Sequence, residues 1–227
     1  MDKKTVQSRL QAAGHYSGRI DGDFGRLSYG ALFSYTGGAA SDLTRHLGEA
    51  AAALFPRYDM VTGLRLAHAL ARWAVETGGF KRMEENLKYS AARLRQVWPS
   101  RFPTLASAQP FAGNPKALAN HVYGGRFGND NANDGWRHRG RGPTQLTFED
   151  NYREAKALTG VDVLADPDLV AQPATGLLVA CAYWGARKIS AAADRDDAAT
   201  VCKLVQGASE GLAEQRAYLA RLKKVLL

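Results

Sequence analysis

The 227-residue sequence predicts a mainly α-helical fold. Apolar residues recur at helical spacing in several segments, as in Leu66, Leu70 and Trp73, which share one helix face. Period-2 alternation, which is typical of half-buried strands, is nearly absent. The composition, with 45% hydrophobic and 23% charged residues, is that of a folded globular protein and excludes a disordered or fibrous chain.

The first 38 residues form a small helical unit. Val6 and Leu10 lie one turn apart, which predicts a short helix, and the segment around Leu32 predicts a second. Residues 14–25 between them are rich in glycine and aspartate and therefore predict turns. We expect residues 1–38 to be a separate unit that precedes the main domain.

We interpret residues 39–44 as a linker and residues 45–227 as the main domain. Helical periodicity in and next to this domain predicts helices over residues 43–55, 64–75, 150–158, 172–188, 198–205 and 212–227. Residues 111–143 are instead rich in glycine and poor in aliphatic residues, which predicts a long irregular functional loop. A short hairpin is expected near residues 140–147.

Charge and cysteine content narrow the function classes. The formal net charge of +8 favours a polyanionic partner, and nucleic acid, an anionic membrane and a cell-wall polymer all qualify. Cys181 and Cys202 are the only cysteines, so a disulfide scaffold is excluded. The five histidines follow no zinc motif, and Ala132 breaks the calcium-like loop at residues 130–135, so we expect neither a metal nor a cofactor.

A first candidate acid ends the apolar helix predicted over residues 64–75. Glu76 follows Trp73 and Val75 and precedes Gly78, which ends the helix. A carboxyl group in such surroundings is partly desolvated, which raises its pKa and suits it to general acid catalysis. The alternative is a solvated glutamate at the end of a helix.

A second candidate acid lies nine residues further on. Glu84 and Glu85 stand among Lys81, Arg82 and Lys88. Neighbouring cations favour the ionised carboxylate that a general base requires. One neutral and one ionised acid are the pair that cleaves a glycosidic bond. The alternative is an exposed charged turn, and the two adjacent glutamates leave the identity of the base open.

A third segment, residues 134–151, is suited to binding a sugar. Trp136 offers a flat face for stacking on a sugar ring, and Gln145, Thr147 and Asn151 supply neutral groups that bond hydroxyls and acetamides. The arginines of this segment suit phosphate instead, but the neutral polar run that follows them favours sugar. Trp136 and Arg141 join the candidate substrate-binding residues.

Together these segments resemble glycoside hydrolase family 19, in its phage endolysin branch. The resemblance covers about residues 42–227, and its motifs lie at residues 64–71, 76–80, 85–91, 98–102, 123–126 and 139–147. It implies a lysozyme-like, two-lobed helical domain with an irregular glycine-rich segment lining a cleft. It also implies hydrolysis of β-1,4 links next to N-acetylated sugars, with inversion.

The resemblance also implies roles for single residues. Glu76 matches the general acid, Glu85 the general base that activates water, and Thr147 the residue that helps to hold that water. In an inverting enzyme the two carboxyl groups lie about 6.5–9.5 Å apart. The positions that match substrate contacts in the family are Tyr89, Gln145 and Asn151.

The chain departs from the family pattern at two places. Val75 stands where many members have histidine, and Gln206 stands near the end where many have asparagine. The N-terminal unit resembles about half of a three-helix peptidoglycan-binding domain, through residues 6–25. We expect this unit either to bind the wall or to be a helical cap on the main domain.

We therefore expect a monomeric endolysin whose partner is peptidoglycan and which binds no nucleic acid. The N-terminus lacks an apolar core, so we expect no signal peptide and release from the host bacterial cytoplasm through a separate membrane pore. The basic helix predicted over residues 212–227 either lies on an anionic envelope or membrane, or docks on the core. Chitin as the substrate and a non-catalytic wall-binding protein are the alternative functions.

Overall fold

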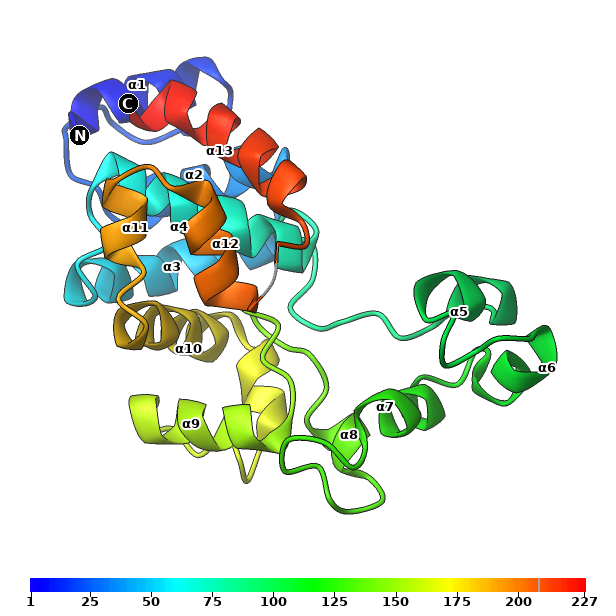
Figure 1. Cartoon of the computed structure of the whole chain (residues 1–227). Coiled ribbons are helices and arrows are strands. Elements are labelled where there is room, and N and C mark those ends of the chain that lie inside the picture. Colours follow the sequence, from blue (N-terminus) through cyan, green and yellow to red (C-terminus); the bar gives the residue numbers. More distant parts are fainter. Residues whose placement is uncertain (208) are drawn as a thin grey trace.

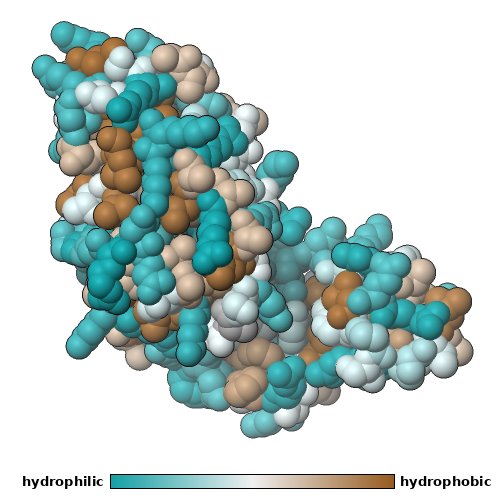
Figure 2. Space-filling view, turned by 45° about the horizontal axis from the view of Figure 1, so that its top comes forward, coloured by the Kyte–Doolittle hydropathy of each residue, from teal (hydrophilic) through white to brown (hydrophobic). Residues whose placement is uncertain are grey.

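The chain folds into two helical lobes, a large body and a smaller lobe that projects from it (Figure 1). The computed structural model describes residues 1–207 and 209–227. Within these residues β-structure is limited to isolated bridges, of Glu84 with Arg141 and of Arg141 with Leu146. The predicted fold class is confirmed, and the hairpin expected near residues 140–147 is present only as these bridges. A wide notch separates the two lobes in the space-filling view (Figure 2).

The large body is built from both ends of the chain. Its first helices are α1 (Lys3–Ala12), α2 (Arg26–Gly37), α3 (Asp42–Arg57) and α4 (Gly63–Thr77). Its last helices are α10 (Pro173–Ala186), α11 (Ser190–Asp194), α12 (Ala198–Gln206) and α13 (Leu212–Leu226). Helices α2, α11, α12 and α13 all pack on α4. Helix α4 is therefore held firmly at the centre of the large body, and so are the residues at its C-terminal end.

Aromatic rings fill the core around α4. The Trp73 ring lies 6.0 Å from that of Trp184 on α10 and 6.2 Å from that of Phe55 on α3, measured between ring centroids. All three side chains are fully or almost fully buried. The helix ends at Gly78, whose φ of 62° is left-handed and costs glycine little. Packing therefore holds α4 in place as far as Thr77, the residue before its C-cap.

The N-terminal unit shares the core of the large body. Helix α1 packs on α13 and α2 packs on α3, and Val6 and Leu10 are buried in the same cluster as Leu222. This arrangement favours the cap interpretation, while wall binding by the unit stays a prediction. The connection expected over residues 39–44 is shorter than that, because Ser41 caps α3 and the helix begins at Asp42.

The smaller lobe has its own apolar core. It comprises α5 (Ala91–Val97), α6 (Leu105–Ala108), the 3-10 helix η1 (Gln109–Phe111) and α7 (Pro115–Tyr123). Leu94, Phe102 and Leu118 are buried at its centre. The prediction of a long irregular loop over residues 111–143 is wrong, because this stretch contains α7 and α8 (Asp134–Arg137). Locally capped short helices leave no long apolar periodicity in the sequence.

A third cluster lies beneath α10. Helix α9 (Glu149–Thr159) and the 3-10 helix η2 (Pro167–Ala171) both pack on α10. The buried side chains of this cluster include Tyr152, Val163 and Val170. The loop of residues 138–148 runs from α8 to α9, and so connects the smaller lobe with the base of the large body (Figure 1).

The C-terminal helix α13 is docked on the core. Leu219, Leu222 and Val225 are buried against the large body, and Lys223 pairs with Asp196. Its apolar face is therefore occupied, and attraction to an anionic envelope through its exposed cations stays a prediction. None of the described helices has the length and apolar character that a bilayer crossing requires.

The docking of α13 predicts a large cost for truncating its buried face. Leu222→Ala should lower the free energy of unfolding by about 2–5 kcal/mol, because it leaves a cavity in the core. The exposed Lys224→Ala should change it by less than about 0.5 kcal/mol. Urea denaturation measures both, and equal effects of the two substitutions would contradict the docked helix.

Candidate active site

A cavity of about 420 Å³ lies in the large body where the end of α4 meets α10, α12 and the loop before α9. The side chains around it are mainly polar and uncharged, with one carboxyl group. The lining residues are Glu76, Thr144, Gln145, Leu146, Thr147, Phe148, Asn151, Tyr183, Val205, Gln206 and Gly207. Four residues that the sequence singled out, Glu76, Gln145, Thr147 and Asn151, are therefore brought together here.

Glu76 lies in the last turn of α4 and faces this cavity. Its side chain is only 11% exposed, and burial raises the pKa of its carboxyl group above the ordinary value. A raised pKa of Glu76 is what its apolar neighbours in the sequence predicted. Oε1 pairs with Arg72, whereas Oε2 receives no hydrogen bond from the described residues. One oxygen is thus held in place, and the other is left for a proton.

Arg72 is the buried partner of Glu76, one turn earlier in α4. Its guanidinium group also donates to the carbonyl of Glu210 at 3.2 Å and to Gln215 Oε1 at 3.4 Å. A cation this close favours the ionised carboxylate and lowers the pKa of Glu76, but burial outweighs it. The sequence signal for this role is an arginine four residues before Glu76, on the same side of the helix.

Glu85 lies on the segment that leads from α4 to the smaller lobe. Its Oε1 accepts from the Gly140 N–H at 2.6 Å, and its Oε2 accepts from the Tyr123 hydroxyl at 2.8 Å. The Glu85 N–H in turn donates to the Gly140 carbonyl at 3.0 Å. Both oxygens are therefore oriented, one by the loop before α9 and one by the end of α7.

Burial also raises the pKa of Glu85, and Lys81, Arg82 and Lys88 are not among the main groups that lower it. Those lysine side chains lie in solvent, where water screens their charges. The groups that lower the pKa are instead the two hydrogen-bond donors, followed by the charges of Arg139 and Arg141. The hydrogen bonds to both oxygens favour the ionised carboxylate, which a general base requires, and so limit the rise in pKa.

The neighbouring Glu84 is engaged elsewhere. Its carboxylate forms an ion pair with Arg139, and its side chain is 41% exposed. Of the two adjacent glutamates, only Glu85 has a buried carboxylate with two oriented oxygens. This geometry favours Glu85 over Glu84 as the candidate base, a role that stays a prediction.

Gly140 connects Glu85 with the cavity. A side chain at position 140 would place its Cβ 2.7 Å from Gln145 Oε1 and 3.3 Å from Glu85 Cδ. The missing side chain thus lets Glu85 and a cavity-lining residue approach the same backbone. Thr147 Oγ1 donates to the Gln145 carbonyl at 2.8 Å, and Asn151 Nδ2 donates to the Thr147 carbonyl at 2.7 Å. These bonds hold the polar wall rigid.

Two other predicted substrate contacts lie outside the cavity wall. Tyr89 packs on the core of the smaller lobe, with its ring 5.5 Å from that of Trp98. Trp136 also packs on this core, and the Arg139 guanidinium lies 3.8 Å from the centroid of its ring. Arg139 therefore covers one face of the Trp136 ring, and stacking of this residue on a sugar stays a prediction.

Arg141 does not contact the cavity either. Its side chain is 1% exposed and pairs with Asp168, and it donates to the Tyr152 hydroxyl and to the Arg137 carbonyl, each at 2.8 Å. A buried guanidinium with all these acceptors fixes the loop rather than binding substrate. The prediction of Arg141 as a substrate-binding residue is wrong, because sequence alone cannot separate a buried arginine from an exposed one.

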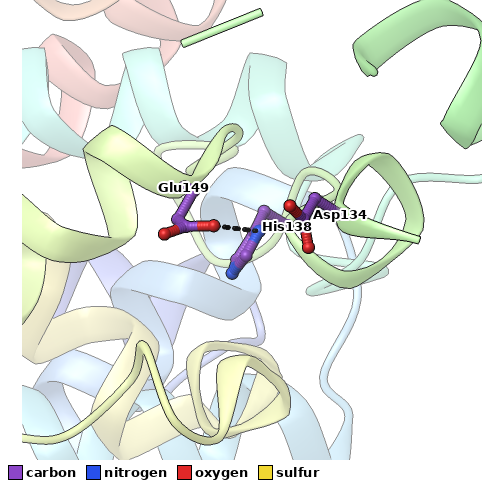
Figure 3. A group of neighbouring side chains, drawn as sticks. All are labelled: Asp134, His138 and Glu149. Carbon is purple, nitrogen blue, oxygen red and sulfur yellow. Dashed lines mark ion pairs between the residues drawn. The ribbon is translucent and has the colours of Figure 1, made fainter. Parts of the chain in front are cut away.

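Asp134, His138 and Glu149 form the one cluster of metal-ligand type found among the described residues (Figure 3). One ligand-type atom from each lies within 4.8 Å of the others. However, Asn129 Oδ1 accepts from the Glu149 N–H at 3.0 Å, and Asn129 Nδ2 donates to the Tyr123 carbonyl at 3.1 Å. This orientation of the amide makes His138 Nδ1, 3.2 Å from the same Oδ1, a donor.

A protonated Nδ1 has no lone pair for a metal ion. In this structure Asn129 links three elements, since it bonds His138, the Glu149 N–H and the Tyr123 carbonyl. Burial lowers the pKa of His138 to about 4, so the ring is neutral at pH 7. Together with Arg141, this link fixes the loop that carries Gly140 and the polar wall of the cavity.

Comparison with known proteins identifies similar chains. The family described as chitinase class I matches residues 108–200. A glycosyl hydrolase family 19 domain-containing protein of Haemophilus influenzae is 31% identical over 169 residues, which cover 74% of this chain and 82% of that protein. Chitinase 2 of rice, Oryza sativa, is 54% identical over 41 residues, 18% of this chain and 12% of its own length.

A similar fold occurs in a solved structure. The crystal structure of chitinase C from Streptomyces griseus superposes with a TM-score of 0.60, covering 86% of this chain and 75% of that one. The sequence identity is 20%, so this likeness concerns the fold alone.

The ion pair in α4 predicts how the pKa of Glu76 responds to substitution. Arg72→Gln removes the positive charge that favours the carboxylate, so the pKa of Glu76 should rise further. Arg72→Lys keeps a positive charge and should give a smaller rise. Titration of the Glu76 carboxyl carbon by ¹³C NMR measures both, and a pKa that falls in Arg72→Gln would contradict the proposed coupling.

The buried His138 predicts a loss of stability on acidification. Between pH 6.5, its ordinary pKa, and its folded value of about 4, the unfolded chain binds a proton that the folded chain does not. The folded state should therefore lose up to about 3 kcal/mol as the pH falls through this range. His138→Asn retains a donor near Nδ1 but does not titrate, so urea denaturation should show a weaker pH dependence. The same pH dependence in both proteins would contradict this assignment.

Proposed function

Because this chain belongs to glycoside hydrolase family 19 and is a glycosidase, we propose that it cleaves the β-1,4 links of the peptidoglycan glycan strand as an endolysin. The observation that carries the proposal is a buried carboxyl group, Glu76, in a cavity with neutral polar groups, together with a second buried carboxyl group, Glu85, that bonds Gly140 in the loop forming the cavity wall. Amide and hydroxyl groups suit the hydroxyls and acetamides of N-acetylated sugars. The net charge of +8 supports an anionic envelope over an uncharged polymer.

In this proposal Glu76 is the general acid. Its raised pKa lets it hold a proton, and its free Oε2 presents that proton to the glycosidic oxygen as the bond breaks. The carboxylate that remains is stabilised by the buried guanidinium of Arg72. This charge pairing matters most after proton transfer, so it favours the transition state over the ground state.

Glu85 is the general base of the same reaction. The Gly140 N–H and the Tyr123 hydroxyl orient its carboxylate, which accepts a proton from a water molecule. Since Thr147 already donates its hydroxyl proton to the Gln145 carbonyl, its oxygen is left to accept from the same water. The water then directs a lone pair at the anomeric carbon, on the face opposite to the leaving group, which gives inversion.

Gln145 and Asn151 are the proposed substrate contacts in the cavity wall. Asn151 Nδ2 donates to the Thr147 carbonyl, so Asn151 Oδ1 is left to accept from a sugar hydroxyl or amide. Gln145 has a left-handed φ of 49°, a strained conformation that suits a residue held for function. Tyr89 stays a prediction, at the edge of the smaller lobe.

The two adjacent glutamates provide a matched test of the proposed roles. Glu85→Gln and Glu76→Gln should each lower turnover of purified peptidoglycan by at least about 10², because each removes acid–base catalysis. Glu84→Gln removes the same charge one position away and should retain most of the activity. Near-normal activity of Glu85→Gln, or an equal loss in Glu84→Gln, would exclude Glu85 as the base.

Substrate class is tested by assaying peptidoglycan and chitin oligomers side by side, with mass spectrometry of the products. Faster release of sugars from peptidoglycan is the expected result, and faster release from chitin would favour a chitinase. A wild-type protein that binds the wall but releases no sugar would favour a non-catalytic binding protein.

A further inference from the structure

Phe127 is the most exposed of the large hydrophobic side chains that the structure describes, with 61% of its surface in solvent. It lies in the loop between α7 and α8. Most large apolar side chains of this protein are buried, and an aromatic ring left in water next to a binding site calls for a functional explanation.

The backbone at this position is strained. Phe127 has a φ of 46° and Phe148 a φ of 75°, and bulky side chains rarely adopt such left-handed conformations. The loop is nevertheless anchored, because the Asp150 N–H donates to the Phe127 carbonyl at 3.1 Å. Strain of this kind persists only where the surroundings impose it, and it is concentrated at functional sites. The exposed ring is thus presented by a fixed loop.

The ring is continuous with the candidate active site. The Phe127 and Phe148 ring centroids lie 5.0 Å apart in an edge-to-face arrangement, and Phe148 lines the cavity. The Phe148 ring also lies 5.5 Å from that of Tyr123, whose hydroxyl donates to Glu85. The Arg126 guanidinium lies 5.5 Å from the Phe127 centroid and 5.2 Å from the Phe148 centroid.

We propose that Phe127, supported by Arg126 and Phe148, forms an outer subsite that binds one further N-acetylated sugar of the strand in the cavity. This inference rests on the proposed function. The apolar C–H face of a pyranose ring covers an exposed aromatic ring, and the exposed guanidinium of Arg126 donates to hydroxyl or carboxylate oxygens of the same sugar. Phe127 is more exposed than Trp136, one face of which is covered by Arg139.

The subsite predicts a dependence on substrate length. Phe127→Ala should lower kcat/KM for N-acetylglucosamine octamers about fivefold more than for tetramers, because only the longer chain reaches the outer ring. Phe127→Trp retains an aromatic face and should keep the wild-type ratio of octamer to tetramer. Leu105→Ala, which truncates a similarly exposed side chain in α6, is the matched control and should also keep it.

An unchanged ratio in Phe127→Ala, or an equal loss of kcat/KM on both lengths, would overturn the subsite. A wild-type protein that cleaves neither oligomer and no peptidoglycan would instead refute the proposed function. In that case calorimetric titration with the octamer still tests the subsite. Phe127→Ala should then bind the octamer about fivefold more weakly than the wild type, and equal affinities would refute the subsite.

Discussion

The active site of this protein depends on a short antiparallel contact between residues 83–85 and 140–142. The Gly142 N–H donates to the Met83 carbonyl at 2.8 Å. The Glu85 N–H donates to the Gly140 carbonyl, and the Gly140 N–H donates to the Glu85 carboxylate. A Cβ at position 140 would lie 2.7 Å from Gln145 Oε1 and 3.3 Å from Glu85 Cδ, so any other residue there would displace these two side chains. It brings the segment that carries the proposed base against the loop that forms the cavity wall. The positions of Glu85, Gln145 and Thr147 all follow from it.

Around this contact the protein buries charge without leaving it unpaired. Glu76 is matched by Arg72 and Glu85 by two hydrogen-bond donors, so desolvation raises both pKa values while the partners limit the rise. The difference between the two acids is one of hydrogen bonding. Glu85 is bonded at both oxygens, whereas Glu76 keeps one oxygen without a donor among the described residues. In the proposed mechanism this asymmetry allows Glu76 to give a proton and Glu85 to take one.

Much of the fold could be predicted from the sequence, because the long helices carry a strong apolar periodicity. Residues 64–75, for example, form α4 nearly as expected, and the glycine at position 78 ends it. The helices of the smaller lobe could not be predicted, since they are short and their stability comes from caps such as Asn114 and from packing on residues distant in sequence. The apolar periodicity of a sequence shows neither helix caps nor contacts with distant residues.

The site was predictable where the chemistry depends on residue type, as for Glu76 and the polar residues 145–151. It was not predictable where burial decides the role. Arg141 and Trp136 look like ligand-binding residues in the sequence, yet one is buried in an ion pair and one face of the other is covered by Arg139. Phe127 was not singled out in the sequence, since an aromatic residue is usually buried, yet it is exposed. In each case the role is set by contacts between segments that lie far apart in the chain.

The central claim is that Glu85 activates a water molecule on the face of the sugar opposite to Glu76. The most direct test is ¹H NMR of the anomeric proton in the first products, recorded before the two anomers equilibrate. The account predicts that cleavage of a β-1,4 link first releases the α anomer, as a single displacement by water requires. Initial release of the β anomer would contradict it, because retention requires a covalent intermediate or assistance from the substrate.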